Sequence, residues 1–211
     1  MATSEELGEI RTVDLPAGTI EYRERGEGPL LLFVHGIIAN GDVWRHVVAD
    51  LARDHRCITP DWPLGGHLRP MKESTDFSLP GLARLVDEFM SALDLEEVTL
   101  VGNDTGGAIC QLVAADHPDR LARLVLTPCD AFDNFLPPPI RHLQVFGRHP
   151  TGLWVLGQAL RFPWVYRLPI AFGRLTERPI PDEIMRSYTD PLRNSITTRR
   201  NFAVLVRSID A

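Results

Sequence analysis

The chain has 211 residues and a mass of 23.6 kDa, and its 44% hydrophobic and 24% charged residues give the balance of a single globular domain with a substantial core. Its formal net charge of −6 and the lack of a basic stripe in the sequence argue against a nucleic-acid partner. The acidic start and the lack of an apolar run of membrane-spanning length predict no signal peptide, no membrane partner and a cytoplasmic location.

Short apolar runs alternate with stretches of helical spacing along the first part of the chain. The predicted elements are, in chain order, a hairpin at 12–28 that turns at Pro16-Ala17-Gly18, a buried strand at 30–34, a helix around 44–51, a strand at 56–59, a helix around 82–90 with Ser78 as its N-cap, and strands at 97–101 and 121–127. This alternation predicts an α/β fold with a mostly parallel sheet that helices cover on both faces.

The most informative segment is 102–107, Gly-Asn-Asp-Thr-Gly-Gly, which follows a predicted strand and leads into a helix. It fits the nucleophile elbow, Gly-x-Nuc-x-Gly, with Asp104 at the apex of a strained turn. Phosphate-binding turns need Gly-x-Gly-x-x-Gly or a terminal Gly-Lys-Ser/Thr, and neither occurs. The alternative is that Asp104 only caps the following helix. A carboxylate at the apex would attack carbon and form an ester with the enzyme.

Four more motifs occur in the same order and spacing as in one known family. They are His35-Gly36 after the strand at 30–34, the Trp44-Arg45 helix start, Ile58-Thr59-Pro60-Asp61, and His117-Pro118-Asp119-Arg120-Leu121. With the elbow, they make the chain resemble the α/β-hydrolase family, in particular its aspartate-nucleophile branch of haloalkane dehalogenases and epoxide hydrolases. The resemblance extends from Ile20 to Asp130 and continues more loosely beyond.

The resemblance implies an α/β-hydrolase core at 1–130, a helical cap at 131–211 and a sheet without the family's last strands. Prolines at 137–139 and the aromatic residues that follow agree with a change of structure after Asp130. A cap of this kind encloses a small apolar organic substrate. Trp164, Tyr166 and Tyr188 are the expected pocket residues, and either tyrosine would donate a proton to an opening epoxide ring; the alternative for each is simple packing.

The resemblance also assigns the oxyanion hole to the backbone N–H groups of Ile37 and Thr105. The side chains at these two positions differ from those of haloalkane dehalogenases, which typically hold the halide with a Trp directly after the nucleophile and often an Asn directly after His-Gly. This chain has Thr105 and Ile37 there. Halide release is therefore disfavoured. The proline that epoxide hydrolases usually carry after His-Gly is missing as well, which weakens that assignment.

The general base and the supporting acid are less clearly marked. No histidine follows position 149, whereas the family's base lies near the C-terminal end, and His35 reads as a structural residue of its turn. Some relatives place the supporting acid just after the strand at 121–127, which makes Asp130 a candidate. Others place it after the next strand, and Asp130 would then only end its strand.

We therefore expect a truncated hydrolase whose strand at 121–127 is an open edge. The alternative function is a non-catalytic α/β-hydrolase-like small-molecule binding protein, or a remnant of the enzyme. Cys57, Cys110 and Cys129 read as reduced thiols, and neither they nor the histidines have metal-ligand spacing, so we expect no metal and no cofactor.

Overall fold

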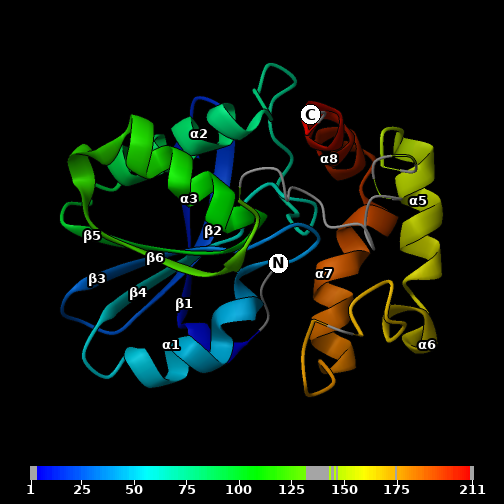
Figure 1. Cartoon of the computed structure of the whole chain (residues 1–211), viewed down its shortest axis with the longest axis horizontal. Coiled ribbons are helices and arrows are strands. Elements are labelled where there is room, and N and C mark those ends of the chain that lie inside the picture. The colour runs from blue at the N-terminus through cyan, green and yellow to red at the C-terminus, as the bar shows by residue number, and fades with distance from the viewer. Residues whose placement is uncertain (1–3, 132–142, 144, 146, 174, 210–211) are drawn as a thin grey trace.

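The computed structural model describes residues 4–131, 143, 145, 147–173 and 175–209. The expected proline segment 137–139 and His142 lie outside the described residues. Strands and helices alternate as far as Cys129, as the hydrophobic pattern predicts (Figure 1). These elements are η1 (Glu5–Leu7), β1 (Glu9–Leu15), β2 (Gly18–Arg25), β3 (Leu30–Val34), η2 (Gly41–Trp44), α1 (Arg45–Leu51), β4 (Arg56–Pro60), α2 (Leu79–Ala92), β5 (Val98–Asp104), α3 (Thr105–Asp116), η3 (Pro118–Arg120) and β6 (Leu121–Cys129).

The six strands form one sheet in the order β1-β2-β4-β3-β5-β6. β1 and β2 form the predicted antiparallel hairpin, and β2 also pairs antiparallel with β4. The remaining neighbours, β4 with β3, β3 with β5 and β5 with β6, are parallel. The prediction of a mostly parallel sheet is confirmed, and the carboxyl ends of β3, β5 and β6 meet at one edge, where parallel α/β sheets bind ligands.

Helices cover both faces of the sheet, with α2 and α3 on one side and α1 on the other (Figure 1). Side chains of β3 alternate between these layers because successive residues of a strand point to opposite faces. Leu32 packs in the larger core with Phe89 of α2, and Phe33 packs in the smaller one with Val48 of α1. This burial on both sides explains why the run at 30–34 contains no polar residue.

The predicted start of α2 is also confirmed. The hydroxyl of Ser78 accepts a hydrogen bond of 3.2 Å from the Gly81 N–H and so satisfies one of the unpaired donors of the first turn.

β6 lies at the end of the sheet, as the sequence predicts. Among the described residues its only strand partner is β5. Leu124, Val125 and Leu126 are 38%, 42% and 42% exposed, which is unusual for three consecutive apolar residues of a strand. One side of β6 therefore offers both unpaired backbone groups and apolar surface.

Every described element after β6 is a helix. These helices are α5 (Pro150–Ala159), α6 (Pro163–Tyr166), α7 (Asp182–Asn194) and α8 (Ile196–Ser208), and they stand together beside the sheet (Figure 1). Leu153 of α5 and Phe202 of α8 belong to the same buried cluster as Phe89 of α2, so this helical group packs directly on the core. None of the described helices is both long enough and apolar enough to cross a membrane.

Candidate active site

Asp104 is the last residue of β5 and stands directly before α3, at the carboxyl edge of the sheet. Its backbone has φ 54° and ψ −135°, a region that non-glycine residues adopt at a cost of about 1–3 kcal/mol. The neighbouring strand holds this turn, since the Asp130 N–H donates a hydrogen bond of 3.3 Å to the Asp104 carbonyl. The Asp104 side chain also accepts from the Thr105 N–H. The residue is therefore a strained strand-to-helix turn and an N-cap at once, and the two sequence interpretations do not exclude each other.

The elbow depends on glycines that let three elements approach closely. A Cβ atom on Gly106 would lie 2.3 Å from the Val34 carbonyl oxygen of β3, and one on Gly107 would lie 2.2 Å from the Cβ of Cys129. A Cβ on Gly102 would lie 2.7 Å from the Cα of Gly107. None of these separations is possible between non-bonded atoms, so the motif Gly-x-Asp-x-Gly-Gly is a steric requirement of this packing.

The two carboxylate oxygens of Asp104 have different surroundings. Oδ1 accepts hydrogen bonds from the Thr105 N–H and from the Thr105 hydroxyl, the latter at 2.9 Å. Oδ2 lies against Gly36, where an added Cβ would approach it to 2.9 Å. Burial raises the pKa of Asp104 above its ordinary value, and the two hydrogen bonds from Thr105 oppose this shift. Oδ1 is thus fixed, while Oδ2 has no hydrogen-bond donor among the described residues.

His35 has the structural role that the sequence predicts. It is completely buried, its Nε2 accepts from the Trp62 N–H at 2.9 Å, and its Nδ1–H donates to the Gly36 carbonyl at 2.8 Å. Burial lowers the pKa of His35. With both ring nitrogens engaged and the ring neutral, His35 supports the turn between β3 and η2 and has no free nitrogen to act as a base.

The two backbone groups predicted as the oxyanion hole differ in their partners. The Ile37 N–H donates to no other described residue, whereas the Thr105 N–H donates to Asp104 itself. Ile37 also lies against the same space as Asp104. Their role toward a bound substrate stays a prediction.

Asp104 opens into two adjoining cavities between the carboxyl edge of the sheet and the helices after β6. The apolar cavity has a volume of about 110 Å³, and every other residue that lines it is hydrophobic: Ile37, Ile38, Leu143, Leu156, Leu160, Ile170, Ala171, Phe172 and Leu175. The larger cavity has a volume of about 360 Å³ and is shared by Asp104, the start of α1 and α7. Its polar or titratable residues are Arg45, His46, Asn103, Asp104, Thr176 and Tyr188.

Of the three predicted pocket residues, only Tyr188 lines a cavity that Asp104 also lines. It is 2% exposed, and burial raises the pKa of its phenol, while the positive charge of Arg45 opposes the shift. The phenol therefore carries its proton at neutral pH, although its raised pKa also makes it a weaker acid than free tyrosine.

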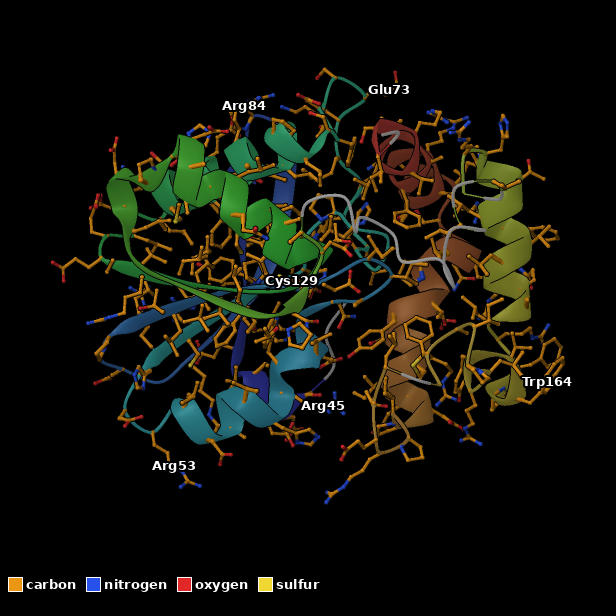
Figure 2. All side chains as sticks on the ribbon, in the orientation of Figure 1. Arg45, Arg53, Glu73, Arg84, Cys129 and Trp164 are labelled. Carbon is orange, nitrogen blue, oxygen red and sulfur yellow. The ribbon has the colours of Figure 1, made fainter. Side chains whose placement is uncertain are left out.

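The structure places Trp164 and Tyr166 outside the lining of both cavities. α6 is one short turn, and its Tyr166 is buried in a cluster with Met185 of α7. Tyr166 donates its hydroxyl to Asp182 and lines neither of the two cavities. Trp164 is 67% exposed and lies at the outer side of the helical group, away from the sheet (Figure 2).

Asp130, the predicted supporting acid, follows β6 and comes close to Asp104 through a shared neighbour. Its Oδ2 lies 3.2 Å from the hydroxyl of Thr105. The side chain is 7% exposed. Burial, together with the negative charge of Asp104, raises the pKa of Asp130 to about 6.

Sequence reasoning missed three features of the site. It treated Phe172 as one aromatic residue among several, although Phe172 lines both cavities. It gave Thr105 only a backbone role, although its hydroxyl contacts two carboxylates. It gave His46 no role at the site, although His46, which lies on α1 within the predicted core helix, is the one described histidine that lines either cavity. For Thr105, the position directly after the nucleophile was a signal that the sequence offered. The roles of Phe172 and His46 depend on tertiary packing.

Comparison with known proteins agrees with this geometry. A family model described as alpha/beta hydrolase fold matches residues 29–203. A haloalkane dehalogenase of Mesorhizobium japonicum is 31% identical over 192 residues, which are 90% of this chain and 58% of that protein. The structure of the haloalkane dehalogenase DatA from Agrobacterium tumefaciens C58 is similar with a TM-score of 0.72 and 25% identity, over 97% of this chain and 70% of that one.

The epoxide hydrolase CorEH is similar with a TM-score of 0.76 and 20% identity, over 95% of this chain and 74% of that chain. At that identity the similarity shows the fold alone. The chain spans a little over half the length of the dehalogenase from Mesorhizobium japonicum.

Proposed function

We propose that this chain, which belongs to the alpha/beta hydrolase fold family, carries the nucleophile and the substrate cavity of a hydrolase that attacks an electrophilic alkyl carbon. The observation that carries the proposal is the position of Asp104, a carboxylate on a strained elbow that faces a cavity lined otherwise by hydrophobic side chains. A carboxylate in an apolar, enclosed space is poorly solvated and therefore more reactive toward an apolar electrophile.

The proposed step is an in-line displacement by Oδ2 of Asp104, since Oδ1 is occupied by two hydrogen bonds from Thr105. A carbon–oxygen bond forms between Oδ2 and the alkyl carbon, and the bond from that carbon to the leaving group breaks with its electron pair. The product is an ester of Asp104, and hydrolysis of this ester would regenerate the carboxylate.

Tyr188 is the proposed donor for the leaving group. It lines the larger cavity together with Asp104, and its phenol keeps its proton well above neutral pH. An epoxide needs such a proton on its departing oxygen, whereas a halide needs donors that stay in place as it leaves. The side chains at 37 and 105 are Ile and Thr, so the site favours an epoxide over an alkyl halide.

Asp130 remains the candidate for the supporting acid, and the base that hydrolyses the ester is not assigned to any described residue. The matched dehalogenase is longer than this chain, so the activity of the whole protein is itself a proposal. The chain as given is therefore expected to form the ester and to hydrolyse it slowly.

Intact-mass spectrometry after incubation with 1,2-epoxyhexane or 1-bromohexane tests the proposal. The epoxide adds its whole mass to the protein because no group departs, whereas the bromide adds a hexyl group and releases bromide. We expect the epoxide adduct to form faster, and Asp104→Asn to abolish both adducts.

A matched variant, Asp116→Asn at the exposed end of α3, should leave both adducts unchanged. If neither compound modifies the wild-type chain but calorimetry shows that hexane-sized ligands bind it, the non-catalytic binding protein becomes the better interpretation.

A further inference from the structure

Thr105 is the only described residue whose side chain hydrogen-bonds both Asp104 and Asp130. Its hydroxyl oxygen lies 2.9 Å from Oδ1 of Asp104 and 3.2 Å from Oδ2 of Asp130. Thr105 is completely buried, and its backbone is fixed at the first position of α3. Water therefore does not compete for its hydroxyl, and the rotamer that reaches both carboxyl groups is held by packing.

Thr105, Asp104 and Asp130 form one hydrogen-bonded unit, and the number of protons that they share limits which hydrogen bonds can form within it. The Thr105 hydroxyl has a single hydrogen, which can be donated to one carboxylate at a time. If that hydrogen is donated to Asp104, the second contact is a hydrogen bond only when Asp130 carries a proton and donates it to the Thr105 oxygen. If both acids are ionised, one of the two contacts is a repulsion between lone pairs. The pKa of Asp130, raised to about 6, means that Asp130 carries this proton below about pH 6 and loses most of it toward neutral pH.

The geometry points to Thr105 as a positioning residue that links the nucleophile to Asp130, so that a proton on Asp130 orients the Thr105 hydroxyl toward Oδ1 of Asp104 and leaves Oδ2 free to attack. This inference rests on the proposed function for its use of Asp104 as the nucleophile. It goes beyond that function because it assigns a task to the Thr105 side chain and makes the reactivity of Asp104 depend on the protonation of a second acid.

Other titratable groups around this unit come from three elements. Cys129 lies on β6 beside both acids, and their negative charges raise the pKa of its thiol, after burial as the main cause. Arg45 and His46 of α1 and Tyr188 of α7 line the cavity that Asp104 faces. Substitutions at 105 and 130 leave all four groups in place, so a change in pH dependence between variants reports on the hydroxyl link.

A nuclear magnetic resonance titration of the wild-type chain, with ¹³C at the aspartate carboxyl carbons, tests the link without any substrate. Thr105→Val has nearly the shape of threonine but no hydroxyl, and Thr105→Ser restores the hydroxyl. A hydrogen bond to an ionised group stabilises the ionised form, whereas a hydrogen bond donated by a protonated acid stabilises the neutral form. Thr105→Val should therefore raise the pKa of Asp104 by about one unit and lower the pKa of Asp130, and Thr105→Ser should restore the wild-type values.

Asp130→Asn is the opposite test, because its amide mimics the protonated acid and removes a negative charge. We expect it to lower the pKa of Asp104. The rate of adduct formation with 1,2-epoxyhexane, followed across a pH series, should move in the same directions, up in pH for Thr105→Val and down for Asp130→Asn.

Unchanged carboxyl titrations in Thr105→Val would overturn the inference, as would a serine variant that behaves like the valine variant. The failure of the proposed function has a different signature, namely a wild-type chain that shows linked titrations but forms no adduct with either compound.

Discussion

Asp104 combines two unfavourable features, a backbone with φ 54° and a carboxylate whose pKa burial has raised. Neither feature helps the fold, since glycine would adopt the same backbone without strain and without a charge to bury. Residues of this kind persist where the strained conformation has a use. The structure and the proposed chemistry agree at this point, because the turn holds Oδ2 in the open while Thr105 occupies Oδ1.

Asp104→Gly should therefore stabilise the protein while it removes the nucleophile. We expect a gain of about 1 kcal/mol in the free energy of unfolding at neutral pH, from the relief of strain less the added flexibility of glycine. Urea unfolding measures this difference. Asp116→Gly, near the exposed end of the same helix, should instead lose up to about 1 kcal/mol. A loss of stability in Asp104→Gly would show that the turn is not strained.

Asp130 gives a pH dependence that can be predicted with its sign. Its pKa in the folded protein is about 6, above the ordinary value of 3.8, so the folded state binds its proton more tightly than the unfolded state. Stability from this group is therefore complete below pH 3.8 and is lost as the pH rises toward 6. Asp130→Asn removes the titration, and its stability relative to wild type should increase by about 1–3 kcal/mol between acidic and neutral pH.

Unfolding midpoints of the two proteins, measured side by side across this range, check the prediction. A constant difference between them would show that Asp130 has the same pKa in the folded and unfolded chains.

At the scale of the element, the strand–turn–helix unit around Asp104 is held by contacts that only glycine permits. Gly107→Ala would place a Cβ at 2.2 Å from the Cβ of Cys129 (the side chain labelled in Figure 2), so α3 and β6 must move apart. We expect a loss of about 1–3 kcal/mol, although alanine is the better helix former. Thermal unfolding monitored by circular dichroism measures it.

The matched control is Ala115→Gly, at an exposed position of α3, which should lose about 1 kcal/mol from helix propensity alone. If Gly107→Ala is as stable as the wild type, the close packing of α3 on β6 is wrong.

Most core elements could be predicted from the sequence because their signals are local. The run at 30–34, the hairpin turn and the Ser78 cap each depend on neighbours within a few residues, and the glycines of the elbow mark its tight turn directly. The cavity wall could not be predicted in the same way. Trp164 and Phe172 both belong to the aromatic stretch after Asp130. Only tertiary packing decides that Trp164 is exposed and that Phe172 lines the cavity of Asp104.

The Thr105 link was missed for a related reason. A backbone role for residue 105 follows from its position in the motif, whereas its side-chain role depends on the start of α3 lying beside Asp130 at the end of β6. Those two residues are 25 positions apart. The contact is fixed only when β5 and β6 pair in their observed register.

At the scale of the whole molecule, the sheet edge at β6 is the most exposed part of the core. A strand with an open side and three partly exposed apolar residues is a template for pairing with another chain. We expect the chain as given to self-associate with rising concentration, and Leu126→Lys to weaken this association by about tenfold because a lysine on an exposed edge strand disfavours edge pairing.

Sedimentation velocity at several concentrations measures the effect. Val155→Lys adds the same charge on α5, where Val155 is 55% exposed, and should leave the association unchanged. An equal effect of both variants would show that net charge, and not the β6 edge, controls the association.

The measurement that tests the account most directly is tandem mass spectrometry of peptides from the wild-type chain after reaction with 1,2-epoxyhexane. We expect one hydroxyhexyl ester, located on Asp104 and absent from Asp104→Asn. A label on Cys129, His46 or another nucleophile with Asp104 unmodified would contradict it.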